Sequence, residues 1–242
     1  MIQILLKEIN VFLDSLIAYI IISVFLTGIG LLMWVFPETS VLNYGFADMG
    51  SFFLLSPYIF MFLIPAITMR MFSEEKRGGT MELLLTRPIR DIEIILGKYL
   101  AGVFLVAFSI LPTLLYYFTI RHLGNPVGNI DTAGVIGSYF GLFLLGAAFT
   151  SIGIFSSSFT ENQVTAFIIA VFLCFFLYFG FDAISSIGIF SGVSDFIDQI
   201  GILYHYNSMS KGLIDTRDLI YFISVISVML LLTNLILRSR KW

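Results

Sequence analysis

The sequence predicts an all-α polytopic membrane protein, a single transmembrane domain over residues 1–242. Hydrophobic residues make up 58% of the chain and charged residues only 12%, whereas a soluble domain carries about 25% charge. Six stretches are apolar over about 20 residues, the length that a helix needs to cross a bilayer. Only a helix satisfies its own backbone hydrogen bonds there within one segment. The expected spans are residues 15–36, 52–72, 94–120, 136–159, 164–187 and 219–237.

The first element is expected to be an interfacial helix. In MIQILLKEINVFLDSL, residues 1–16, apolar and polar residues alternate at helical spacing, which is typical of a helix that lies along the membrane surface. We expect it to turn from there into the first span. The apolar run that follows is too long for a cleaved signal peptide, and no small-residue cleavage site comes after it.

Lys and Arg are distributed unevenly between the loops. With the N-terminus inside, the inner segments hold ten of the 13 basic residues, and the outer ones hold Arg121, Lys211 and Arg217. Basic residues are retained on the cytoplasmic side of membranes. Both termini are therefore predicted to be cytoplasmic, together with the loop between the second and third spans.

That loop carries an island of charge. Residues 73–98, SEEKRGGTMELLLTRPIRDIEIILGK, hold ten charged residues of a chain that has only 13 basic and 16 acidic ones. Gly78 and Gly79 interrupt the chain, and Thr80 is a suitable cap for a short helix. One face of this helix is apolar at Met81, Leu84, Leu85 and Pro88. Such a helix suits insertion into a groove of another protein, while the spacing alone equally allows an interfacial loop that anchors the fold.

The third span begins directly after the island. Pro88 suits the first turn of a helix, where the helix dipole favours the carboxylates of Asp91 and Glu93. The following GKYLAG, residues 97–102, lacks the glycine spacing of a G-x-x-x-x-G-K-[ST] phosphate loop and runs into the span. The sequence therefore predicts a protein that is not itself an ATPase or another enzyme.

Three segments resemble ABC-2 type exporter permeases. FSEEKRGGTMELLLTRPIRDIEIILGKYLAG, residues 72–102, is similar to the family signature E-x-x-x-G-T-x-E-x-L-L-x-x-P followed by G-K at the third span. KEINVFLDSLIAYIIISVFL, residues 7–26, resembles the family's elbow helix and first span, although the family often has Pro where Leu16 stands. SSSFTENQVTAFIIAVFLCFFLYF, residues 156–179, resembles its turn from span four to span five.

A narrower resemblance is to the permeases of gliding-motility ABC transporters of Bacteroidota. It is carried by PETSVLNYGFADM (37–49), FLIPAITMRMFSEE (62–75) and NPVGNIDTAGVIGSYFGL (125–142). It implies an exporter subunit of the bacterial inner membrane that supports gliding. The broader family leaves open another exported substrate, such as a lipid, drug, ion or polysaccharide.

The resemblance implies that the island contains a coupling helix that docks on a separate ATPase subunit, which binds ATP and Mg²⁺. It also implies a second permease protomer, identical or different. The charges would set docking specificity, while the leucines fill a groove. The residues expected to take part are Glu75, Gly79, Thr80, Met81, Glu82, Leu84, Leu85, Arg87 and Pro88.

Two further patterns predict structure rather than chemistry. Thr160 and Gln163 have the spacing of a capping box at the start of span five. A stripe of small residues on span four, at helical spacing, allows another helix to approach closely, within the protomer or at a dimer seam. The stripe consists of Gly146, Thr150, Gly153 and Ser157.

Other residues support no further chemistry. His122 and His205 have no second metal ligand at useful spacing, and Cys174 is expected to be a small buried hydrophobe. Asp14 and Asp182 lie near span ends, where a charge costs little, or else they line a transport route. Residues 189–218 are too polar to span and are expected to form short amphipathic helices at the outer face.

The sequence fits two other functions less well. A six-span intramembrane protease needs a nucleophilic serine in a glycine-rich turn within the bilayer, but GVSD at 192–195 lies in the predicted outer loop. A channel would leave the charged island without a purpose, and no filter-like loop is evident.

Overall fold

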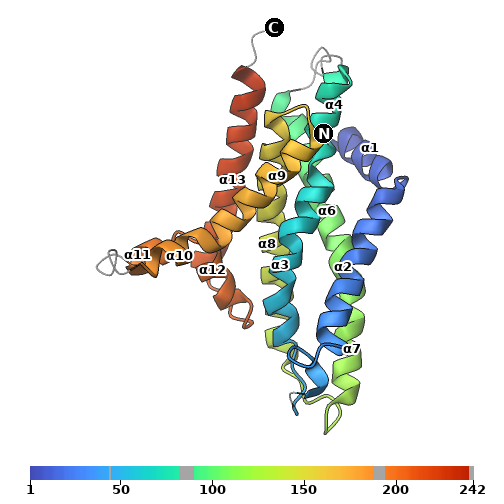
Figure 1. The fold of residues 1–242 in the computed structure, drawn as a ribbon, viewed down its shortest axis with the longest axis vertical. Coiled ribbons are helices and arrows are strands. Elements are labelled where there is room, and N and C mark those ends of the chain that lie inside the picture. The colour runs from blue at the N-terminus through green and yellow to red at the C-terminus, as the bar shows by residue number, and fades with distance from the viewer. Residues whose placement is uncertain (44, 82–89, 188–193, 240–242) are drawn as a thin grey trace.

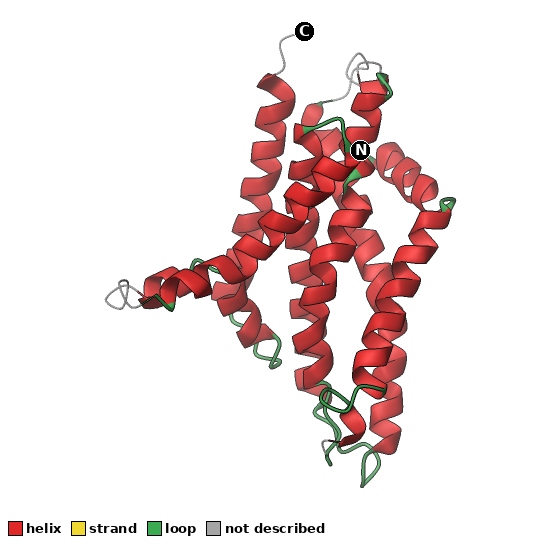
Figure 2. Ribbon diagram, viewed as in Figure 1, coloured by secondary structure: helices red, strands yellow, loops and turns green. Residues whose placement is uncertain are grey.

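The computed structural model describes residues 1–43, 45–81, 90–187 and 194–239. Within these ranges the chain forms helices joined by loops and contains no strand (Figures 1 and 2). The longer helices are α1 (Ile2–Leu13), α2 (Leu16–Trp34), α3 (Gly50–Thr68), α4 (Arg70–Arg77), α6 (Asp91–Ile110), α7 (Leu114–Leu123), α8 (Thr132–Phe159), α9 (Gln163–Phe175), α12 (Ile202–Met209) and α13 (Thr216–Ser239). Shorter elements are η1 (Val41–Asn43), η2 (Leu111–Thr113), the π-helical turn η3 (Phe176–Gly180), α10 (Phe181–Ser185) and α11 (Ser194–Asp198).

Five to six of these helical runs are long and apolar enough to cross a membrane. Five qualify alone: Gly50–Arg77, Asp91–Leu123, Thr132–Phe159, Gln163–Ser185 and Thr216–Ser239. The sixth is the bent pair α1 and α2, in which the axes of Ile2–Leu13 and Ala18–Trp34 differ by 70°. The predicted all-α fold is confirmed. The second span is longer than expected, because α4 continues the helix past residue 72 to Arg77.

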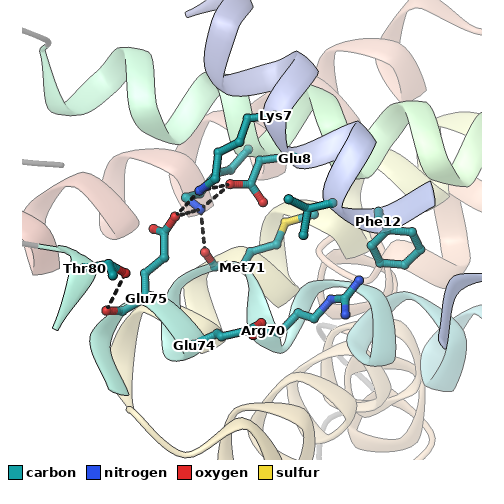
Figure 3. A pocket seen from close by; sticks show the side chains of 10 residues that line it. Lys7, Glu8, Phe12, Arg70, Met71, Glu74, Glu75 and Thr80 are labelled. Carbon is teal, nitrogen blue, oxygen red and sulfur yellow. Dashed lines mark hydrogen bonds and ion pairs between the residues drawn. The ribbon is translucent and has the colours of Figure 1, made fainter. Parts of the chain in front are cut away.

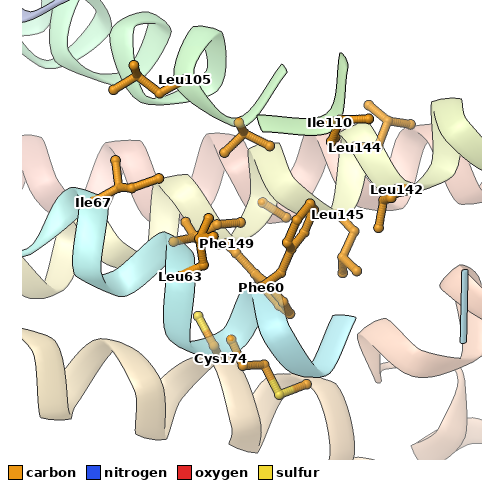
Figure 4. Packing of buried hydrophobic residues seen from close by; sticks show 14 of the residues in the cluster. Phe60, Leu63, Ile67, Leu105, Ile110, Leu142, Leu144, Leu145, Phe149 and Cys174 are labelled. Carbon is orange, nitrogen blue, oxygen red and sulfur yellow. The ribbon is translucent and has the colours of Figure 1, made fainter. Parts of the chain in front are cut away.

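Helix α8 is the centre of the bundle. It packs against α3, α4, α6, α9, α12 and α13. Large side chains of α3 and α8, such as Phe60 and Phe149, fill the space between these helices, and Cys174 of α9 is fully buried beside them (Figure 4). The peripheral spans Gln163–Ser185 and Thr216–Ser239 bury a much smaller share of their length than the other three spans that qualify alone, which is expected where lipid is the solvent.

The small-residue stripe of α8 faces helices of the same chain. A Cβ atom added to Gly146 would lie 2.5 Å from Cγ1 of Val106 in α6. Thr150 packs against Gly102 of α6, where an added Cβ would lie 2.6 Å from Cγ2 of Thr150. Gly153 is in close contact with Thr68 of α3, and Ser157 is fully buried. The stripe lets α3 and α6 approach α8 closely.

The start of α9 differs from the predicted capping box. Asn162 is the N-cap, and its Oδ1 accepts hydrogen bonds from the backbone N–H groups of Val164 and Thr165. The Thr160 hydroxyl instead accepts from the Asn162 N–H, at 3.1 Å. The prediction of a Thr160–Gln163 box is therefore wrong, because a closer capping side chain satisfies the free N–H groups of the first turn.

The segment between α9 and α13 penetrates further into the bundle than expected. Figure 1 shows α10 and α11 extending sideways, while α12 returns against the other helices. Ile202, Tyr206 and Met209 of α12 are buried, and the Tyr206 hydroxyl donates to the carbonyl oxygen of Phe53 in α3, at 2.6 Å. The prediction of short helices is confirmed within residues 194–218, but α12 is part of the core rather than a surface element.

Candidate functional site

The charged island connects the end of α4 to the start of α6. Helix α4 ends at Arg77 with Gly78 as its C-cap, and Gly79 has a φ of +67°, a conformation that favours glycine. The chain returns as α6, which begins after Arg90 and carries Asp91 and Glu93 in its first turn, as predicted. In Figure 1 the end of α4 lies at the same end of the molecule as the start of α1 and the end of α13.

Three of the predicted docking residues at this turn are described. Residues 80 and 81 are helical, so the predicted cap Thr80 is the first helical residue after Gly79, and its hydroxyl donates to the carbonyl oxygen of Glu75, at 3.3 Å. Met81 is buried, with 3% of its surface exposed. Five further predicted docking residues lie outside the described part of the chain: Glu82, Leu84, Leu85, Arg87 and Pro88.

The remaining docking candidate, Glu75, belongs to a group of four charged residues that we call the ionic cluster: Lys7, Glu8, Glu75 and Lys98. Its centre is Lys98, which comes from α6 and has a side chain only 1% exposed. The Lys98 Nζ lies 2.8 Å from Oε1 of Glu8 and 3.0 Å from Oε1 of Glu75. It also donates to the carbonyl oxygen of Met71, at 2.6 Å (Figure 3). An ammonium group has three N–H donors, and each has an acceptor here.

The cluster joins three helices that are distant in the sequence. Lys7 of α1 completes it, with its Nζ 2.8 Å from Oε1 of Glu75 and 3.2 Å from Oε1 of Glu8. Two positive and two negative charges are thus balanced, which offsets the cost of removing Lys98 from water. Burial disfavours the charged form of Lys7, but the hydrogen bond to Glu75 and the charges of Glu8 and Glu75 outweigh it and raise the pKa of Lys7.

Two further basic residues of α4 attach this helix to its neighbours. Lys76 is buried and donates from Nζ to the carbonyl oxygen of Ser158 in the last turn of α8, where the helix dipole attracts a cation. The Arg70 guanidinium lies 4.7 Å from the ring centre of Phe12 and donates to the Ser15 hydroxyl, at 3.3 Å. Helix α4 is therefore held by α1, α6 and α8 together.

A cavity of about 220 Å³ opens beside the ionic cluster. Its lining comes from α1, α4, α6 and the turn after α4, and includes Arg70, Glu74 and Thr80 as well as the cluster itself (Figure 3). Among the described residues, no group of three or more His, Cys, Asp or Glu side chains could hold a metal ion. The paired charges of the cluster are suited to fixing the position of α4.

Sequence reasoning missed most of this site. The sequence places Lys7 and Lys98 among the basic residues that orient the protein, gives Glu8 no role, and assigns Glu75 to a docking surface. A signal was present, because Glu8 and Lys98 each lie within an apolar helical pattern, where an unpaired charge is costly. Nothing in that signal identifies the partner.

The family comparison agrees with this architecture. A family model described as ABC-2 family transporter protein matches residues 3–241. The chain belongs to this family. As an ABC-2 protein it is the membrane permease of an ABC transporter, a component distinct from the ATPase with which it works. No curated protein sequence matches the chain.

Proposed function

We propose that this ABC-2 permease is the membrane-spanning half of an exporter whose ATPase subunit docks on the segment between α4 and α6. The observation that carries the proposal is the anchoring of α4, which leads directly from the span into that segment. Ion pairs and hydrogen bonds within the chain hold three residues: Glu75, Lys76 and Lys98. A force applied to the segment is therefore transmitted to α1, α6 and α8. Glu75 then acts by holding the base of the segment, while the more distal residues contact the ATPase.

The mechanism we propose is alternating access in a dimer of permeases with two ATPase subunits. Closure of the ATPase dimer on ATP pushes the two coupling segments together and tilts α3 and α6, which opens a path between the protomers. ATP shifts this equilibrium only by the difference in its binding free energy between the two states. The resemblance to gliding-motility permeases supports a role in gliding; export of another substrate is the alternative.

Association with an ATPase tests this proposal most directly. The purified chain is expected to hydrolyse no ATP, whereas the chain expressed with its cognate ABC ATPase is expected to co-purify with it and to support hydrolysis. Complementation of a non-gliding mutant that lacks its permease tests the gliding role separately. ATP turnover by the isolated chain, or a failure to bind any ABC ATPase, would contradict the proposal.

Orientation provides a second test. Asn43→Cys and Val127→Cys are expected to react with an impermeant thiol reagent added outside cells, and Arg77→Cys only after the membrane is permeabilised. All three positions are exposed. The single native cysteine, Cys174, is buried, so the unmodified chain serves as the unlabelled control. The opposite pattern would place the coupling segment outside the cell and exclude docking on a cytoplasmic ATPase.

A further inference from the structure

The cavity beside the ionic cluster is bordered by residues with unused hydrogen-bonding atoms. Oε1 of Glu75 binds both lysines of the cluster, whereas its Oε2 is buried and has no hydrogen-bond partner in the described ranges. Nη2 of Arg70 is likewise buried and unpartnered there, although Nη1 donates to the Ser15 hydroxyl. A buried polar atom without a partner costs free energy. Two such atoms, one acceptor and one donor, in residues that line one cavity indicate a ligand with polar groups of both kinds.

Glu74 adds a second carboxylate to the same wall. It is exposed, lines the cavity and follows Arg70 by four residues on α4. Residues at this spacing are neighbours on a helix surface, and Figure 3 shows both side chains on the α4 side of the cavity. The ion pairs of the described chain nevertheless include neither residue. A positive and a negative group thus stand side by side without neutralising each other.

The lining as a whole is electrically balanced. It contains equal numbers of basic and acidic side chains: Lys7, Arg70, Lys98, Glu8, Glu74 and Glu75. A ligand with a net negative charge would be repelled by the three carboxylates, and one with a net positive charge by the three basic groups. The lining therefore fits a zwitterion, with its anionic part at Arg70 and its cationic part at Glu74 and Glu75.

The position of the cavity favours a membrane lipid as the source of this zwitterion. The axes of α1 and α2 differ by 70°, so α1 lies close to the membrane plane when α2 crosses the bilayer. The cavity lies between α1 and α4, at the depth where an interfacial helix meets the lipid headgroups. Val11 of α1 lines it and is 50% exposed, so acyl chains can approach from this side. A volume of about 220 Å³ is far larger than one water molecule needs.

We propose that this cavity binds the headgroup of a phospholipid with a primary amine, such as phosphatidylethanolamine, from the leaflet in which α1 lies. The phosphate accepts hydrogen bonds from the Arg70 guanidinium, whose planar fork matches phosphate oxygens. The ammonium group donates to the Glu74 carboxylate and to Oε2 of Glu75. A quaternary amine has no N–H and would leave these acceptors without a donor. The bound lipid joins α1 to α4, whatever substrate the exporter carries.

Discrimination between headgroups can be measured on the full chain in detergent. Native mass spectrometry counts the lipids retained from dioleoyl-phosphatidylethanolamine, its N,N-dimethyl form and dioleoyl-phosphatidylcholine, whose amines carry successively fewer N–H groups. Binding is expected to weaken in that order. Phosphatidylcholine should bind about tenfold more weakly than phosphatidylethanolamine, because hydrogen bonds to charged groups are lost. Equal binding of the three lipids, or a preference for the anionic phosphatidylglycerol, would overturn the proposal.

Three variants assign the two ends of the headgroup. Glu74→Gln removes a carboxylate that takes part in no described ion pair, and should weaken phosphatidylethanolamine binding about tenfold with little effect on phosphatidylcholine. Arg70→Gln should weaken all three lipids alike, because they share the phosphate. Arg77→Gln changes an exposed position of α4 outside the lining and should bind as the parent does. If Glu74→Gln keeps the parent's preference, or Arg77→Gln loses it, the amine is not bound in this cavity.

Competition distinguishes a lipid from a soluble molecule with the same headgroup. Glycerophosphoethanolamine carries the phosphate and the amine but no acyl chains, so it lacks the apolar contacts of the lipid. It is expected to displace dioleoyl-phosphatidylethanolamine only in large excess. Displacement at equal concentrations would overturn the assignment of the cavity to a membrane lipid.

Discussion

Lys98→Met is expected to destabilise the permease more than any other single change in the ionic cluster. Methionine fills a volume similar to that of lysine but leaves Glu8 and Glu75 to share Lys7, whose side chain is about half exposed. Removing one partner of a buried ion pair costs about 3–5 kcal/mol. A chain of this size should then unfold at a temperature lower by on the order of 10 °C. Thermal unfolding of the detergent-solubilised chain measures the shift.

Two matched variants separate charge balance from packing. Lys98→Met combined with Glu75→Gln restores equal numbers of charges, since Lys7 and Glu8 remain 3.2 Å apart, and should recover a large part of the loss. Lys98→Arg keeps the charge in a larger group and should be intermediate. If Lys98→Met unfolds at the temperature of the parent, or the double variant is worse than the single one, the ionic cluster does not hold these helices together.

Leu84→Asp is expected to abolish co-purification of the ATPase while the permease still inserts into the membrane. The apolar face of the predicted coupling helix would place the new carboxylate unpaired in the ATPase groove. Such burial costs about 3 kcal/mol, which weakens docking on the order of 100-fold. Co-purification in detergent, at low and high salt, measures the effect. Residue 84 lies outside the described ranges, so this prediction rests on the sequence pattern.

The leucine triplet supplies a matched control for this experiment. Leu83→Asp makes the same substitution on the other face of the predicted helix and should leave docking nearly unchanged. Glu82→Lys changes a rim charge and should alter the salt dependence more than the affinity. If the segment only anchors the fold at the membrane surface, Leu84→Asp will co-purify with the ATPase as well as Leu83→Asp does.

The sequence by itself determined the elements of this protein. Span length and apolar content are local properties, so the all-α architecture and the approximate spans could be predicted without any contact between them. The same holds for Gly79, whose positive φ ends α4, and for the acidic first turn of α6. The site was predicted only to the extent that the charged island marked its place in the chain.

Only the tertiary structure decided which charges face inward. Lys98 and Glu8 are 90 residues apart, so their spacing follows no helical or strand period. Whether a charge is exposed or paired depends on which helices pack together, and in this bundle small residues of α8 decide that by letting α3 and α6 approach. Packing of this kind depends on the shapes of all the helices at once, and for that reason no local pattern in the sequence contained it.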